Sequence, residues 1–318
     1  MTYYELINQI IRKKVFETKT IVLFGQNIDA GSCLSGLTRN LKVQENSLII
    51  NTPNSENSLC GIGFGLMLSN VASVFFMKQQ DFLLLGIDHL VNTFNFIRLK
   101  KPSASFTIMN IVVDSGYEGP QSCLNNLADF CSISRTPGFT ITNKIDAEQI
   151  INSQLVSPGF RIISVSQRLA NKDVIETEKI FSRSDDTLFK YTEGNDATIV
   201  CFNFTFPQGQ ELYKKLKNKN INSSLFSVNT PLPIDWNEII QDVKKTGNIV
   251  IIDDSKSSNL SCDNLLVEVM RECKLSNEIV VKRKLDDSLL VPNPDTLIID
   301  YEGIIGKLTA SMKQKLCR

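Results

Sequence analysis

The chain has 318 residues, 42% of them hydrophobic and 21% charged, which is ordinary globular usage and enough for two domains with full cores. Lys and Arg together number 34, as do Asp and Glu, so the formal net charge is zero and no basic face points to nucleic acid as a partner. No run reaches the roughly 18 apolar residues of a membrane span, and the start of the chain is unlike a signal peptide, so we expect a cytoplasmic protein.

The first half of the chain alternates amphipathic helices with short apolar strands. In chain order the pattern predicts a helix over 3–17, a strand over 19–23, a helix over 32–41, a strand over 47–50, a glycine-rich helix that begins at Glu56, a strand over 71–77, a helix over 82–100, a strand over 106–113, a loop over 114–120, a helix over 122–130, a strand over 138–141, a helix over 146–153 and a strand over 161–164.

The second half repeats this alternation after a polar stretch, residues 166–195. It predicts strands over 197–202, 224–228, 248–253 and 278–281, and helices over 208–217, 236–245, 262–273 and 301–315. Strands that alternate with helices indicate parallel, doubly wound sheets. The expected fold is therefore α/β with two doubly wound domains: an α/β domain over 1–165, an extended linker over 166–195 and a second α/β domain over 196–318.

The eight cysteines are scattered and form no CxxC pair, and the only histidine is His89. Structural zinc sites need clustered Cys and His ligands, so we expect no metal site on this chain and read the cysteines as reduced, mostly buried thiols.

The stretch 51–82 holds the first candidate catalytic residue. A turn at Thr52 and Pro53 places Glu56 at the start of the glycine-rich helix, and another apolar strand follows. A carboxylate between a turn and apolar segments is expected to be partly desolvated, which suits a group that exchanges a proton. An acid in the first turn of a helix also complements the helix dipole, and this stretch alone leaves both interpretations open.

Several motifs occur in an order and spacing that extend beyond this stretch. In the first half they are Thr52-Pro53-x-Ser55-Glu56-Asn57, Gly61-x-Gly63-x-Gly65, Asp81-Phe82-Leu83-Leu84 with Asp88 and Asn92, Gly119-Pro120-Gln121, Pro137-Gly138 and Asp146-Ala147. In the second half they are Glu193-Gly194-x-Asp196-Ala197-Thr198 and Lys244-Lys245-Thr246-Gly247. Through them the chain resembles the beta subunit of the thiamine diphosphate-dependent decarboxylase component of 2-oxoacid dehydrogenase complexes, within the transketolase-like family.

This resemblance implies a transketolase-like pyrimidine-binding domain followed by a transketolase C-terminal-like domain. It implies that Glu56 hydrogen-bonds a ring nitrogen of the cofactor's aminopyrimidine and thereby favours the tautomer that takes the proton from the thiazolium carbon. It also implies that Phe82 stacks on the same ring; ordinary core packing is the alternative for Phe82.

The family's motif for diphosphate and magnesium, Gly-Asp-Gly followed by Asn, is missing from this sequence. The run Gly61–Gly65 lies in a predicted helix and is interpreted as close helix packing. The resemblance therefore implies that an alpha-type subunit supplies the diphosphate and magnesium site, and that the active site forms at an interface in an alpha2beta2-like assembly. A lipoyl acyltransferase is a further candidate partner.

The chain departs from the family after Gly-Pro-Gln, where Ser122 replaces an active-site histidine. Ser122, Gln121 and His89 are candidate substrate or interface residues; Ser122 is alternatively a helix N-cap, and His89 a surface or interface residue. The spacing of Gln79, Gln80 and Asn92 does not decide between the ring edge and the subunit interface.

Three functions follow from the resemblance and its departures. The first is a beta-type subunit of a 2-oxoacid dehydrogenase-like enzyme. The second is the C-terminal half of a split transketolase-like enzyme of a specialised pathway. The third is a non-catalytic structural or regulatory beta-like subunit. The sequence does not specify the substrate, the acceptor or the stoichiometry.

Overall fold

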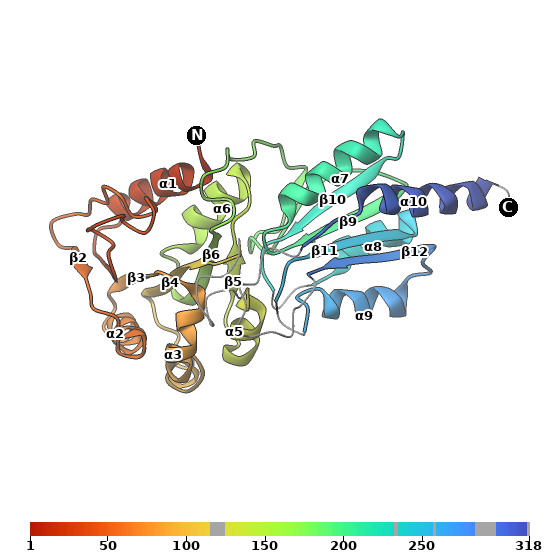
Figure 1. The fold of residues 1–318 in the computed structure, drawn as a ribbon. Coiled ribbons are helices and arrows are strands. Elements are labelled where there is room, and N and C mark those ends of the chain that lie inside the picture. The colour runs from red at the N-terminus through yellow and green to blue at the C-terminus, as the bar shows by residue number, and fades with distance from the viewer. Residues whose placement is uncertain (115–124, 232–234, 257–258, 284–296, 317–318) are drawn as a thin grey trace, which may run out of the picture. The chain divides into compact units, whose positions relative to one another are not determined.

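The computed structural model describes residues 1–114, 125–231, 235–256, 259–283 and 297–316, and the chain folds into two compact units. The first unit comprises Met1–Glu176 and the second begins at Thr177. Each unit is a six-stranded, mainly parallel sheet between helices (Figure 1). The predicted α/β fold with two doubly wound domains is therefore confirmed.

The first sheet is parallel throughout and has the strand order β2-β1-β3-β4-β6-β5. Its strands are β1 (Ile21–Gly25), β2 (Leu48–Asn51), β3 (Ala72–Met77), β4 (Ser105–Val112), β5 (Gly138–Thr140) and β6 (Gly159–Ser166). Every residue of β4 is buried, as expected for a central parallel strand that is covered on both faces. Because all six strands run the same way, their carboxyl ends lie along one edge of the sheet.

Two helical layers cover the first sheet. Helices α1 (Tyr3–Glu17) and α6 (Lys144–Gln154) lie on one face, and α2 (Glu56–Leu68), α3 (Leu83–Asp88) and α5 (Leu127–Ser134) lie on the other (Figure 1). A 3-10 helix, η1 (Gln80–Phe82), precedes α3, and a π-helix, η2 (His89–Thr93), joins α3 to α4 (Phe94–Arg98). A capping box between Thr2 and Glu5 fixes the start of α1.

Aromatic rings hold α2 against the middle of the first sheet. The ring of Phe64 on α2 packs edge-on against Phe106 of β4 and Phe160 of β6, with centroid distances of 4.9 and 4.8 Å. Gly63 makes this approach possible, because a Cβ there would lie 2.2 Å from the Phe106 ring. These contacts hold the second half of α2 against the sheet.

The second sheet has the order β12-β11-β9-β10-β8-β7, with four parallel strands and an antiparallel edge. Its strands are β7 (Phe181–Ser182), β8 (Leu188–Thr192), β9 (Ala197–Phe202), β10 (Ser223–Val228), β11 (Asn248–Asp253) and β12 (Asn277–Lys282). Helices α7 (Phe206–Asn218) and α10 (Tyr301–Leu316) lie on one face, and α8 (Asn237–Thr246) and α9 (Asp263–Glu272) on the other (Figure 1).

Three segments differ from the sequence prediction. The stretch 32–41 forms successive turns and no helix, because Cys33, Leu34 and Ser35 all have positive φ near 50–59°. The predicted helix over 82–100 is divided by η2 into shorter pieces. The expected linker over 166–195 contains β7 and β8; β8 pairs with β10 and β7 pairs with β8, so both strands lengthen the second sheet.

Candidate functional site

The candidate site starts at Glu56, the first residue of α2. The turn after β2 leads into Ser55, whose side chain does not cap the helix and instead donates to Ser58 Oγ at 3.1 Å. Glu56 is only 8% exposed. Within the part of the chain that the structure describes, its carboxylate has no hydrogen-bond or ion-pair partner. A sheltered acceptor is thus available to a group from outside the described residues.

The thiol of Cys60 marks the apolar character of this position. Cys60 lies one turn after Glu56 on α2, where burial raises the pKa of its thiol to about 12 and the charge of Glu56 adds to the rise. The neutral thiol is therefore the stable form of Cys60 over a wide pH range.

Helix α3 packs against this end of α2 through Gly86. A Cβ at Gly86 would lie 2.5 Å from Cys60 Sγ and 3.6 Å from the carbonyl oxygen of Glu56. This contact brings the segment that contains Phe82 to the same helical layer as Glu56. Phe82 is half-buried, and no other aromatic ring of the described residues stacks on it.

Gln80 anchors the turn that carries Phe82. Its buried side chain donates from Nε2 to Ser164 Oγ on β6 at 3.2 Å and accepts at Oε1 from the backbone N–H of Asn126 at 2.9 Å. Ser164 in turn donates to Asn110 Oδ1 on β4 at 2.8 Å. Gln80 is therefore a structural residue. Its position in the sequence had left open whether it lies at the cofactor ring or at a subunit interface.

His89 is engaged in the packing of the helical layer. Its Nδ1 lies 2.9 Å from Thr93 Oγ1 within η2, and a Cβ at Gly61 of α2 would lie 3.0 Å from its Nε2. The interpretation of Gly61 and Gly63 as close packing positions is confirmed, whereas a Cβ at Gly65 would have no atom within 4 Å. On the same surface, Asn92 donates to Asp88 Oδ1 at 2.6 Å.

Two candidate residues, Gln121 and Ser122, lie outside the described residues. The loop after β4 is described up to Asp114, whose buried carboxylate accepts from Ser166 Oγ at 2.6 Å and from the Arg168 backbone N–H at 2.8 Å. These bonds fix the point from which the loop departs.

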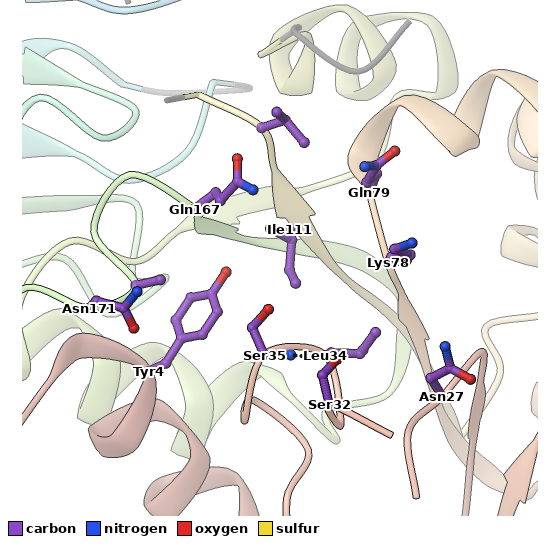
Figure 2. A pocket seen from close by; sticks show the side chains of 12 residues that line it. Tyr4, Asn27, Ser32, Leu34, Ser35, Lys78, Gln79, Ile111, Gln167 and Asn171 are labelled. Carbon is purple, nitrogen blue, oxygen red and sulfur yellow. Dashed lines mark hydrogen bonds between the residues drawn. The ribbon is translucent and has the colours of Figure 1, made fainter. Parts of the chain in front are cut away.

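The sequence did not reveal a pocket of about 300 Å³ at the same edge of the first sheet (Figure 2). Residues from five separate segments line it, and Glu56 and Phe82 are not among them. The lining residues are Tyr4, Asn27, Ser32, Leu34, Ser35, Lys78, Gln79, Ile111, Val113, Gln167, Ala170 and Asn171. Their convergence depends on the strand order, which no local motif encodes.

Among the described residues, no three His, Cys, Asp or Glu side chains are grouped as a metal site would require. Within the same residues, none of the helices has the length and apolar character needed to span a lipid bilayer.

Comparison with known proteins gives consistent results along the chain. Residues 189–280 match the family model of the transketolase C-terminal domain. The chain is 22% identical over 296 residues to 2-oxoisovalerate dehydrogenase subunit beta 2, mitochondrial, of Arabidopsis thaliana, covering 89% of this chain and 80% of that protein. It is 20% identical over 293 residues to the pyruvate dehydrogenase E1 component subunit beta of Staphylococcus aureus, covering 89% of both.

A solved structure shares the fold of the whole chain. It is described as a split gene transketolase, inactive beta4 tetramer, and it aligns with a TM-score of 0.70 and 15% identity over 98% of each chain. Both units of the chain therefore belong to one known two-domain architecture.

Proposed function

Because the chain is transketolase-like and resembles beta subunits over most of its length, we propose that it provides the pyrimidine-binding half of a thiamine diphosphate enzyme. The observation that carries the proposal is that Glu56 is a buried residue whose carboxylate has no hydrogen-bond or ion-pair partner among the described residues. Burial of such a group is costly unless another molecule supplies the missing hydrogen bond.

Glu56 and Phe82 fit the aminopyrimidine ring of this cofactor. The carboxylate of Glu56 would bind a ring nitrogen and hold a proton there, and the half-buried ring of Phe82 would lie against the heterocycle. When bound, thiamine diphosphate supplies a carbon acid that adds to a carbonyl group and accepts the electrons of the bond that breaks. Gln80 would keep Phe82 in place through its bonds to Ser164 and Asn126.

The diphosphate and its magnesium require another chain, since the sequence has no Gly-Asp-Gly motif. We infer an alpha-type partner that carries this motif, in an alpha2beta2-like assembly. The similar split gene transketolase is described as inactive when it forms a beta4 tetramer, which supports the idea that a chain of this kind needs a partner. A lipoyl acyltransferase would join the assembly if the product is an acyl group.

The reaction class follows from the relatives. Both named relatives are subunits of 2-oxoacid dehydrogenases, so decarboxylation of a 2-oxoacid is the first candidate. Ser122 stands where those enzymes have a histidine in the family pattern, so we expect the acceptor chemistry to differ from theirs.

The test uses this chain co-expressed with an alpha-type chain from the same source. In the complex, Glu56→Gln is expected to lower the cofactor-dependent turnover of 2-oxoacids by roughly 10²–10⁴-fold, because the carboxyl proton donor and acceptor is lost. The rate of deuterium exchange at the thiazolium carbon should fall in parallel. Glu45→Gln, which changes an exposed glutamate of the same unit, is the matched control and should leave both rates unchanged.

The proposal has two parts, a cofactor site shared with a partner chain and a role of Glu56 in cofactor activation, and calorimetry tests the first of them. The isolated chain is expected to bind thiamine diphosphate far more weakly than the complex, because it lacks the diphosphate motif. Tight binding by the isolated chain would contradict the shared site, and an unchanged exchange rate in the Glu56→Gln complex would contradict the role of Glu56.

A further inference from the structure

We propose that the pocket in the first unit binds a small anion through Lys78. The strand order places this pocket at a particular point of the sheet. After β1 the chain adds β2 on one side and then β3 on the other, so β1 and β3 form the topological switch point. In open doubly wound sheets the crevice beyond the carboxyl ends of such a strand pair is the usual ligand site.

Half of the lining residues follow the two strands that this rule names. Asn27 and Ser35 follow β1, and Lys78 follows β3 directly. Figure 2 shows Lys78 on one side of the pocket and Tyr4 and Asn171 on the opposite side. A volume of about 300 Å³ accommodates a small metabolite and is at the lower end of the range for small-molecule sites.

The charges of the lining determine what kind of ligand fits. Lys78 is the one charged residue among the described lining residues, and neither Asp nor Glu lines the pocket there. Within the described residues Lys78 forms no ion pair or hydrogen bond. An ammonium group without a counter-ion attracts anions, and the amide and hydroxyl groups around it supply further hydrogen bonds.

The floor and one wall give the pocket a fixed shape. Ile111 of β4 and Leu34 contribute apolar contacts in the midst of the polar rim. The wall after β1 contains three consecutive non-glycine residues in the left-handed region, an arrangement that costs about 1–3 kcal/mol per residue and is typical of ligand-binding segments. Asn8 of α1 holds this wall by donating to the carbonyl oxygens of Leu37 and Arg39 at 3.0 Å each.

The ligand class is therefore a compact molecule with one carboxylate or phosphate group and additional hydrogen-bonding groups. The proposal goes beyond the proposed function, because neither Glu56 nor Phe82 lines the pocket, whereas Tyr4 of α1, the helix on the other face of the sheet from α2 and α3, does. The binding itself does not depend on the cofactor, because the described lining belongs to this chain alone.

The experiment titrates the isotopically labelled 318-residue chain with inorganic phosphate and, separately, with pyruvate, without thiamine diphosphate. The side-chain amide signals of Asn27, Gln79 and Asn171 report on the pocket by nuclear magnetic resonance. We expect saturable shifts with at least one anion, a dissociation constant raised about tenfold or more in Lys78→Gln, and recovery in Lys78→Arg. Lys19→Gln changes an exposed lysine that precedes β1, at the opposite edge of the sheet, and should bind as the unchanged chain does.

Comparison of phosphate with pyruvate shows whether the anionic group of the ligand is a phosphate or a carboxylate. Tighter binding of phosphate assigns the pocket to a phosphorylated ligand, and tighter binding of pyruvate assigns it to a carboxylate. Shifts that do not saturate with either anion, or equal affinities in Lys78→Gln and the unchanged chain, would overturn the proposal. Failure of the Glu56 test with intact anion binding would instead leave this pocket in place and remove only the cofactor role.

Discussion

At the residue scale, the burial of Glu56 bears on its two interpretations, as a complement to the helix dipole and as a cofactor-binding acid. An acidic residue complements the dipole of α2 equally well when it is exposed to water. Glu56 is only 8% exposed, and its carboxylate has no hydrogen-bond or ion-pair partner among the described residues. The position therefore fits a group that binds something else better than a group that only stabilises the helix.

Cys60 gives a prediction of pH dependence at the same position. Burial raises the pKa of its thiol to about 12 in the folded state, so the folded chain holds this proton more tightly than the unfolded chain. The stabilisation is complete below the pKa of the unfolded thiol, near 8.5, and is lost as the pH rises toward the folded value. In this window the free energy of unfolding should fall by about 1.4 kcal/mol per pH unit for this thiol.

Urea unfolding followed by circular dichroism at several alkaline pH values measures this slope. Cys60→Ser should flatten it by the stated amount, since a serine hydroxyl does not ionise in this range. Glu56→Gln should retain most of the slope, because burial is the larger cause of the shift. Equal slopes in Cys60→Ser and the unchanged chain would show that the thiol is not buried as described.

At the element scale, α2 offers two glycines with opposite expected effects. Gly63→Ala would place a Cβ 2.2 Å from the Phe106 ring, so we expect destabilisation of about 1–3 kcal/mol through overpacking. Gly65 is exposed and a Cβ there would meet no atom within 4 Å, so Gly65→Ala should stabilise the helix by about 0.5–1 kcal/mol. Thermal unfolding of the two variants provides the comparison, and changes of the same sign would contradict this packing of α2.

Most elements were predictable because their signal is local. The strands 197–202 and 248–253 were predicted with their observed bounds, since continuous apolar runs between turn residues define them. The helix prediction over 32–41 was wrong. The apolar residues there have helical spacing, but the backbone forms turns that include left-handed residues, and Asn8 of α1 stabilises this segment. The short strand β8 was missed because its residues alternate less clearly and depend on pairing with β10.

Some residues of the candidate site could likewise be predicted from local motifs, whereas others could be recognised only in the folded structure. Glu56 and Phe82 could be named from a motif and its family resemblance, and their roles remain predictions. Lys78 could not be found, because its importance arises only when the ends of β1 and β3 meet in the folded sheet. The structural role of Gln80 likewise depends on Ser164, 84 residues away along the chain.

At the scale of the whole molecule, the surface of the first unit indicates association. Large apolar side chains remain exposed on or directly after α2, α3 and α4, in the helical layer that contains Glu56 and Phe82. They are Ile62, Leu68, Leu84, Leu85, Phe96 and Leu99. Patches of this kind mark interaction sites, and a net charge of zero provides little repulsion between copies. The proposed alpha2beta2-like assembly would cover this layer.

The assembly prediction is tested by placing a charge in this layer. Leu85 is 60% exposed and Phe96 is 77% exposed, so Leu85→Glu and Phe96→Glu should fold normally yet weaken association by about tenfold or more, because each buries a carboxylate in an apolar interface. Phe16→Glu changes a similarly exposed ring on α1, in the helical layer on the other face of the sheet, and should leave association unchanged. Sedimentation velocity over a range of concentrations distinguishes these outcomes, and an unaltered assembly in both α3 and α4 variants would place the interface elsewhere.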